Sequence, residues 1–522
     1  MIHSRRSPNP TAARAAVLAL ATLGLASGSA TGEPAAYWWA PGEPRTLAPD
    51  SRYGNEAGEV GVHLEGGAEL TAGHPFFVPL GTNGRACVSC HQPQDAMSLS
   101  LASIRERWRV TDGRDPLFAM VDGADCPHLP PGDPASHSLL LGRGLIRVAM
   151  PWPPRDPQGK VIEPQFSLEV VRDPTGCNTH PDYGLKSAAP QVSVYRRPRP
   201  VANTKYTTHQ GFGVTPFIGK SGMPTARDPE TGRFVSMNLM ADARVPTLAL
   251  QAADAARGHL ERSEPLTDAQ LRGILDLESR LYVAQVAHRS AGALDEPGGP
   301  TGLGPLNLVR GEAGVLGNNT ARWVIPMEDK WKALPRSGDP AADARAAARE
   351  SIQRGHDIYM FRTFWIRDSM HLNNVGLGNP TKRTCATCHG MHMTGMDTAN
   401  GWMDIGTTNL PWAREEPLNP WNPRQERMPL FKVTCRDDVN PHPFLGRVIY
   451  TQDPGRALVT GQCNDVGAIV MQQLRGLAAR PPYFSNGVAA DLREVVDLYD
   501  RRYNIGYTEQ EKVDLIHFME AL

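Results

Sequence analysis

Two identical patterns decide how this chain can fold: Cys87-Val-Ser-Cys90-His91 and Cys385-Ala-Thr-Cys388-His389. The C-x-x-C-H pattern is that of c-type haem attachment, in which two thiols add to the haem vinyl groups and the adjacent histidine ligates the iron. One match could be chance or a redox-active cysteine pair, but two matches in one chain are a specific signal. A zinc site would need four converging ligands, and these pairs lie far apart in sequence. We therefore expect two covalently attached haem c groups, one held by Cys87, Cys90 and His91 and the other by Cys385, Cys388 and His389.

The composition is that of a folded protein with long loops. Hydrophobic residues make up 40% of the 522 residues and charged residues 21%, which excludes a disordered polyelectrolyte. Gly (50) and Pro (46) are abundant, so we expect long loops that hold a modest number of helices. Lys and Arg (54) balance Asp and Glu (55). Because no global basic field exists, nucleic acid is not an expected partner.

Residues 1–30 have the pattern of a cleaved signal peptide. Arg5, Arg6 and Arg14 precede the apolar run 15–26, and Gly28 to Ala30 offer a small-residue cleavage site. The run is short for a membrane span, which favours cleavage over an uncleaved anchor. In either case the body of the protein is exported, and we expect it in the periplasm.

The four remaining cysteines allow three pairings. In an oxidising compartment an even remainder indicates disulfides. The local pairs Cys126–Cys177 and Cys435–Cys463 keep each bridge beside its own haem segment, and we favour them. The alternative is four free buried thiols.

The fold class expected from these features is mainly α, with two tandem cytochrome c-type haem domains that carry long loop-rich insertions. The N-terminal haem domain is expected at 31–290, a Gly- and Pro-rich linker at 291–335 and the C-terminal haem domain at 336–522. Capping residues and apolar stripes predict helices at Thr267–His288, Asp343–Phe361 and Asp491–Tyr503, and a last helix that starts at Thr508.

The closing stretch resembles the diheme cytochrome c peroxidase and MauG family. Residues 474–487 (LRGLAARPPYFSNG) and 491–499 (DLREVVDLY) are similar to the family pattern LR…APYFHDG…TLEEVVxFY. Residues 242–252 (DARVPTLALQA) are a weaker match to its WDGR…LEEQA segment. The spacings depart widely from the family, so insertions are expected in both domains.

The resemblance implies that the N-terminal haem, with proximal ligand His91, reacts with peroxide. Alignment on Gln251, which matches the family's distal Gln, places Glu261 at the catalytic Glu position, with His259 nearby. A base is needed there because peroxide cleavage moves a proton between its two oxygens. The alternative is that Glu261 and His259 are solvated residues at a helix end. No His stands where some members place a removable distal ligand, which suggests an open site.

For the second haem the resemblance implies His389 as proximal ligand and a relay role. Tyr499 falls where the family carries Met or, in MauG-like members, Tyr, so we expect it as the sixth ligand. The other candidates are His392, Met393 and Met396, and a core aromatic is the alternative role of Tyr499.

Three positions depart from the family. Its inter-haem Trp falls at Ala241, and Ser485 replaces the His of its PYFHDG segment. Its calcium-binding Asn is absent near Pro198, so no side chain named here supports the Ca²⁺ that the resemblance implies.

Several functions remain compatible with the sequence. The expected one is a periplasmic peroxidase that reduces hydrogen peroxide with electrons from a small periplasmic donor protein. A MauG-like oxidase of a protein or organic substrate would use Tyr499 to favour oxidised iron. A diheme electron carrier without substrate and a dioxygen-activating oxygenase similar to the rubber-cleaving enzymes are the alternatives. The resemblance also suggests a homodimer.

Overall fold

The computed structural model describes residues 37–522 except 157–158, 209–237, 312–328, 370–378, 390–401 and 410–426. The predicted signal peptide and part of the predicted linker therefore lie outside the described residues. All described residues fall within one compact unit, Glu33–Leu522. Within these ranges no helix is long and apolar enough to cross a membrane.

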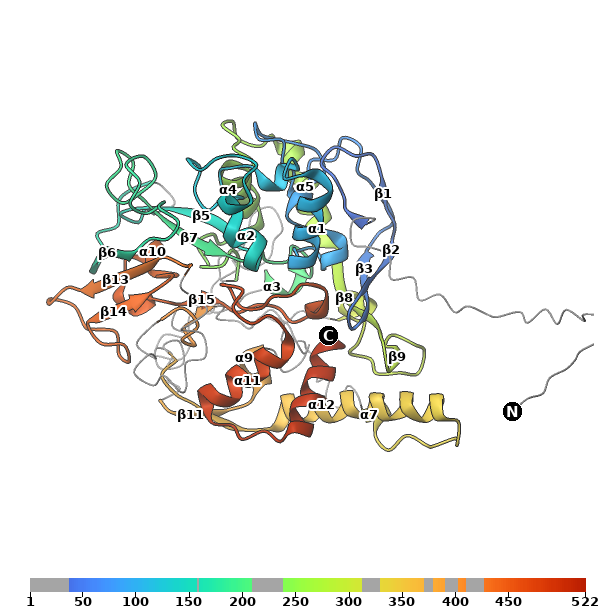
Figure 1. Ribbon diagram of the computed structural model, residues 1–522. Helices are drawn as coiled ribbons and strands as arrows, with labels where there is room; N and C mark the ends of the chain where they lie inside the picture. The colour runs from blue at the N-terminus through green and yellow to red at the C-terminus, as the bar shows by residue number, and fades with distance from the viewer. Residues whose placement is uncertain are drawn as a thin grey trace, which may run out of the picture. The chain divides into compact units, whose positions relative to one another are not determined.

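The helices are short except for one (Figure 1). Many of them begin after a capping residue. Asp339, for example, precedes α7, and its side chain accepts hydrogen bonds from the N–H groups of Ala341 and Ala342. The described helices are α1 (Leu101–Thr111), α2 (Ser138–Arg143), α3 (Thr204–Thr207), α4 (Leu248–His259), α5 (Asp268–Arg280), α6 (Pro305–Arg310), α7 (Pro340–Phe361), α9 (Cys385–His389), α10 (Ala457–Thr460), α11 (Leu492–Tyr503) and α12 (Glu509–Glu520).

The described strands form small antiparallel sheets. Three of these sheets have the strand orders β2-β3-β8-β9, β14-β13-β6 and β5-β7. The strands are β1 (Thr46–Leu47), β2 (Asp50–Asn55), β3 (Gly58–Leu64), β4 (Glu69–Leu70), β5 (Ile146–Pro151), β6 (Phe166–Arg172), β7 (Gln191–Arg196), β8 (Leu281–His288), β9 (Gly292–Ala293), β10 (Phe364–Ile366), β11 (Thr381–Arg383), β12 (Trp402–Met403), β13 (Leu430–Cys435), β14 (Val448–Thr451) and β15 (Ile469–Val470).

The prediction of a mainly α fold is wrong. The described part of the chain is about 32% helical and 19% strand, which makes the fold mixed α/β. Several of the strands, β5 to β7 and β12 to β14, lie in stretches that were expected to be loop-rich. There the abundant Gly and Pro obscured short alternating segments such as Gln191–Arg196, which pairs with Ile146–Pro151.

The predicted helix Thr267–His288 divides into two elements. Thr267 and Gln270 form the expected capping box, and α5 runs to Arg280. At Leu281 the backbone becomes extended, and β8 pairs with β3 from there to His288. The stretch LYVAQVAH contains β-branched and aromatic residues that fit a sheet, and tertiary pairing overrides the continued helical pattern. The other three predicted helices are confirmed as α7, α11 and α12.

The first haem motif lies in a core formed by β2, β3, β8 and α5. Val60, Val62 and Val283 from the sheet pack with Ile274 and Leu277 from α5, and Val88 of the first motif belongs to the same cluster. The interior is closely packed, so the turn at Cys87 has a fixed position relative to this sheet.

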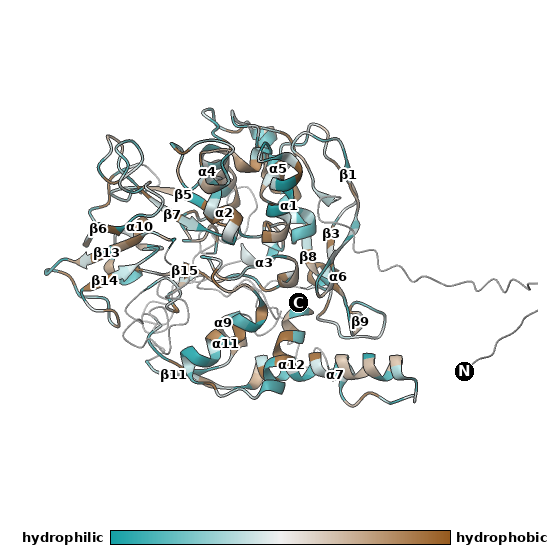
Figure 2. Ribbon diagram, viewed as in Figure 1, coloured by the Kyte–Doolittle hydropathy of each residue, from teal (hydrophilic) through white to brown (hydrophobic). Residues whose placement is uncertain are grey.

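The second haem motif lies in a core formed by α7, α11 and α12. Ile352 and Tyr359 of α7 pack with Leu515 and Phe518 of α12, together with Ala386 of the second motif. Figure 2 shows polar and apolar residues alternating along these helices, as expected for helices that bury one face. The second motif is therefore held by the C-terminal helices.

One sheet joins strands from the two predicted haem domains. β6 and β13 are antiparallel: Phe166 lies opposite Cys435 at one end, and Arg172 lies opposite Leu430 at the other. β14 pairs with the other edge of β13. The predicted boundary at 291–335 stays a prediction, but this sheet is built from residues on both sides of it.

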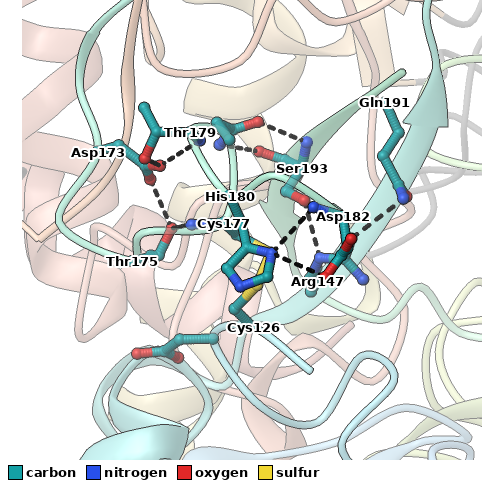
Figure 3. The surroundings of a disulfide bond; sticks show 12 residues. Cys126, Arg147, Asp173, Thr175, Cys177, Thr179, His180, Asp182, Gln191 and Ser193 are labelled. Carbon is teal, nitrogen blue, oxygen red and sulfur yellow. Dashed lines mark hydrogen bonds and ion pairs between the residues drawn. A yellow bond between two sulfur atoms is a disulfide. The ribbon is translucent and has the colours of Figure 1, made fainter. Parts of the chain in front are cut away.

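Both predicted disulfides are confirmed, Cys126–Cys177 and Cys435–Cys463. The first lies within a network of polar side chains (Figure 3). Asp173 accepts hydrogen bonds from Thr175 Oγ1 (2.8 Å) and Thr179 Oγ1 (2.9 Å). Arg147 donates to Ser193 Oγ (2.8 Å). These contacts and the covalent bond fix a loop that has little hydrophobic core of its own.

The crossing of α7 and α12 predicts a strong effect of a single methyl group. A Cβ on Gly355 would overlap the backbone carbonyl of Asp514 and lie 2.7 Å from Phe518 Cβ. We expect Gly355→Ala to lower the free energy of unfolding by about 1–3 kcal/mol, because the packed helices would have to separate. Gly142→Ala in α2 is the matched control, since nothing lies within 4 Å of its Cβ position. Denaturant unfolding of both variants checks this, and equal midpoints would contradict it.

Candidate functional site

The first motif forms a tight turn at the edge of a cavity. Cys87–Ser89 is a 3-10 turn, and the N–H groups of Cys90 and His91 both donate to the carbonyl of Cys87 at 3.1 Å. The turn brings both thiols and the imidazole into one cavity of about 1290 Å³, open solvent at its mouth included. We call this the first cavity. The two thiols are not joined in a disulfide, as covalent attachment of a cofactor requires.

The His91 ring is set up as a metal ligand. Its Nδ1 lies 3.1 Å from the carbonyl oxygen of Met97. A carbonyl can only accept, so Nδ1 carries the hydrogen and Nε2 keeps its lone pair. Burial lowers the pKa of His91 to about 4, against the hydrogen bond to Met97, which raises it. The ring is therefore neutral at pH 7, the form that binds iron.

A carboxylate–imidazole pair stands beside the first cavity. His259, at the end of α4, lines the cavity, and its Nδ1 lies 2.5 Å from Asp122 Oδ2. Asp122 is buried and also forms an ion pair with the buried Arg85. Asp122 is thus an ionised acceptor, which places the hydrogen of His259 on Nδ1 and leaves Nε2 able to accept a proton.

Burial and two nearby guanidinium groups favour the neutral form of His259, and the Asp122 carboxylate opposes them. Burial, followed by the positive charges of Arg244 and Arg85, lowers its pKa to about 4. Arg244 is itself held by Asp242 and Asp254, each at 3.0 Å. Asp122 could not be predicted from the sequence, because no sequence pattern identifies a residue 137 positions from His259 as its hydrogen-bond partner.

The predicted distal residues separate into two groups. Gln251 lies on α4 and lines the first cavity together with His259. Its Oε1 is buried, and no described residue hydrogen-bonds to it. Glu261 follows the helix, is exposed, has φ +52° and is not among the described residues that line the cavity. The structure brings Gln251 and His259 together and leaves Glu261 outside.

Glu278 is a buried carboxyl group in the same cavity that the sequence analysis did not single out. It lies on α5, is 3% exposed, and its Oε2 has no hydrogen-bond partner among the described residues. Burial raises its pKa to about 8, so the group is largely neutral at pH 7. A signal was present, because Glu278 follows Ile274 and Leu275 on the apolar face of this helix, where a charge is unexpected.

The second motif lines a second cavity of about 1490 Å³, open solvent at its mouth included. Cys385, Cys388 and His389 all face it from α9. Burial lowers the pKa of His389 to about 4, so the ring is neutral at pH 7. The cavity wall is rich in phenol rings, contributed by Tyr359, Tyr483, Tyr499, Tyr503 and Tyr507.

Tyr499 lines the second cavity with Cys385 and His389, and it also packs against the surrounding core, so its role as a sixth ligand stays a prediction. It is carried by α11 with Tyr503, and their ring centroids are 6.1 Å apart. Burial, followed by the neighbouring Tyr503, raises the pKa of Tyr499 well above its ordinary value. The phenol would therefore lose its proton only to a strong cation such as iron. The other candidates, His392, Met393 and Met396, lie outside the described residues.

The donor sets fit haem better than a metal held by protein alone. Across the described ranges no three His, Cys, Asp or Glu side chains could together hold a metal ion. A porphyrin supplies its own four nitrogen ligands, so a single neutral histidine beside two free thiols is sufficient. The same finding gives calcium no side-chain site among these residues.

Comparisons with known proteins give a limited match. No protein-family model matches the chain. Over 81 residues the chain is 41% identical to cytochrome-c peroxidase IdrP1 of Pseudomonas sp. (strain SCT), a segment that covers 13% of this chain and 21% of that protein. The match thus spans about a fifth of the relative's length.

Two solved structures overlay loosely on the chain. They are hydrazine synthase of Kuenenia stuttgartiensis (13% identity, 63% of this chain, 73% of that chain) and a MauG-like protein associated with microbial copper homeostasis (16%, 63% and 76%). Both have a TM-score of 0.25, which is too low to show a shared fold.

The carboxyl of Glu278 predicts a pH-dependent stability. Its pKa is raised from 4.5 to about 8 on folding, so the folded state holds a proton that the unfolded state loses. Between about pH 4.5 and about pH 8 its contribution therefore becomes less favourable as the pH rises. We expect Glu278→Gln to gain stability over the parent protein across this range, as measured by denaturant unfolding. A difference that does not change with pH would contradict the assignment. Glu264→Gln, an exposed carboxyl, is the control.

The chain therefore shares one segment of 81 residues with cytochrome-c peroxidase IdrP1. Its own two C-x-x-C-H turns each line a cavity.

Proposed function

We propose that this chain is an exported diheme c-type oxidoreductase of the peroxidase/MauG type, which reduces hydrogen peroxide at the first cavity and relays electrons from the second. The observation that carries the proposal is the first cavity, which combines Cys87, Cys90 and His91 with the imidazole of His259. The cytochrome-c peroxidase match supports this class of chemistry. The two disulfides support export, because such bonds persist in oxidising compartments.

The residues of the first cavity can handle the protons of this reaction. A haem held by Cys87, Cys90 and His91 would supply the iron that binds peroxide and exchanges electrons. His259 Nε2 accepts a proton, and Asp122 stabilises the resulting imidazolium through Nδ1–H. The buried Glu278 carboxyl holds a second proton within the same cavity.

A MauG-like oxidase is the second candidate, favoured by Tyr499 in the second cavity. An anionic phenolate ligand would stabilise oxidised iron there and suit storage of oxidising power. The two candidates differ in their reductant: a peroxidase oxidises a small reduced donor cytochrome when peroxide is added, whereas the MauG-like oxidase acts on a protein or organic substrate.

The first test counts the haems. Mass spectrometry of the protein expressed with a haem-attachment system should show two covalently bound haems. Cys87→Ala and Cys385→Ala should each weaken one attachment site, and Cys87→Ala/Cys90→Ala and Cys385→Ala/Cys388→Ala should each lose one haem entirely. A parent protein with fewer than two haems would sink the proposal. If the protein carries two haems whose spectra do not change with peroxide, in either the fully oxidised or the half-reduced state, it is an electron carrier.

The second test concerns the proton acceptor. We expect His259→Gln to slow the reaction with peroxide by about 10²–10⁴-fold, the usual contribution of a general base, with unchanged resting spectra. Asp122→Asn should slow it as well, because an amide can donate to Nδ1 and reverse the tautomer. Stopped-flow mixing with peroxide measures both rates. If Glu261→Gln reacts slowly with peroxide while His259→Gln reacts at the parental rate, Glu261 is the base, as the family resemblance implies. Glu264→Gln serves as the control.

A further inference from the structure

The two cavities are adjacent, and we call the residues that lie between them the wall. Arg197 and Pro198 line both of them. Beside these residues, Met240 and Ala241 line the first cavity, and Val470 and Met471 line the second. Among the described residues, two short stretches of backbone from distant parts of the chain, 240–241 and 470–471, therefore lie between the two cavities at this point.

Hydrogen bonds cross directly between these two stretches. The N–H of Val470 donates to the carbonyl of Ala241 at 2.8 Å. Arg199 donates from Nη1 to the carbonyl of Met240 at 2.8 Å and from Nη2 to the carbonyl of Met471 at 3.2 Å. One planar guanidinium thus binds both sides of the wall at once, which a single ammonium group cannot do with the same geometry.

Buried ion pairs fix the ends of the wall. Arg196 pairs with Asp242 (2.6 Å) and with Asp453 (2.7 Å), and both carboxylates are buried. Arg456 donates to the carbonyls of Asp242 and Ala243, each at 2.9 Å. The stretch after Ala241 therefore has little freedom to move away from the stretch around Val470.

Resting on the proposed function, we propose that Arg199 is a positioning residue for electron exchange between the two haem sites. Its fork holds Met240–Ala241 against Val470–Met471, and the electron crosses the wall through these hydrogen-bonded backbone groups. One electron lost at the second site is gained at the first. The step makes and breaks no bond and requires no further reactant.

The test measures electron exchange within the two-haem protein. A light-activated reductant delivers less than one electron per oxidised molecule, and the change in the two haem spectra with time gives the exchange rate. Optical titration of the same samples gives the two midpoint potentials. Arg199→Lys keeps the charge and removes the fork, so we expect a several-fold slower exchange with little change in either potential. Arg199→Gln should slow the exchange and also lower both potentials, because a nearby positive charge stabilises the reduced state.

Arg147→Lys is the matched control. Arg147 is also buried and donates to Ser193 Oγ and to the carbonyl of Val121, but it lines neither cavity. Its exchange rate should equal that of the parent protein. A parental rate in Arg199→Lys, or an equal loss in Arg147→Lys, would overturn the inference while leaving the proposed function intact. A parent protein without two haems would overturn both.

Discussion

The structure depends on the buried charge pairs around Arg196. This guanidinium joins the end of β7 to Asp242 and Asp453, which lie 46 and 257 residues away from it. Burial alone would raise the pKa of Asp242, but Arg244 and Arg196 hold it well below its usual range. Loss of one partner from a buried pair typically costs about 3–5 kcal/mol, because the other charge stays buried and unpaired. This cluster therefore fixes Asp242, which directly follows the Met240–Ala241 stretch that lines the first cavity.

The two cavities have different chemical character, which supports a division of labour. The first contains the imidazole of His259, the neutral buried carboxyl group of Glu278 and the amide of Gln251, whose Oε1 accepts no hydrogen bond from the described residues. Groups of these kinds can accept, hold and orient protons, as the proposed function requires. The second cavity is lined mainly by phenol rings and apolar side chains, with Arg197 and Arg480 as its charged residues besides the histidine of the motif. Such surroundings exclude water and suit a centre that only gains and loses electrons.

The sequence predicted features that arise from neighbours along the chain. The C-x-x-C-H turns, both disulfides, and the capped helices beginning after Asp491 and Thr508 all have local signals. Features that arise from distant segments were missed. The strand β8 follows α5 without a break in the apolar pattern, and only its pairing with β3 makes it a strand. The Asp122–His259 pair and the exposed position of Glu261 also depend on how separate segments pack.

The sheet β14-β13-β6 has a consequence for biogenesis. β6 receives its partner β13 only after about half of the chain has followed it, because Val433 pairs with Leu168. Until then β6 presents an unpaired edge, and closing so long a loop is entropically costly and slow. Exposed strand edges are also sites of aggregation. A fragment that ends before β13 would therefore leave that edge permanently open.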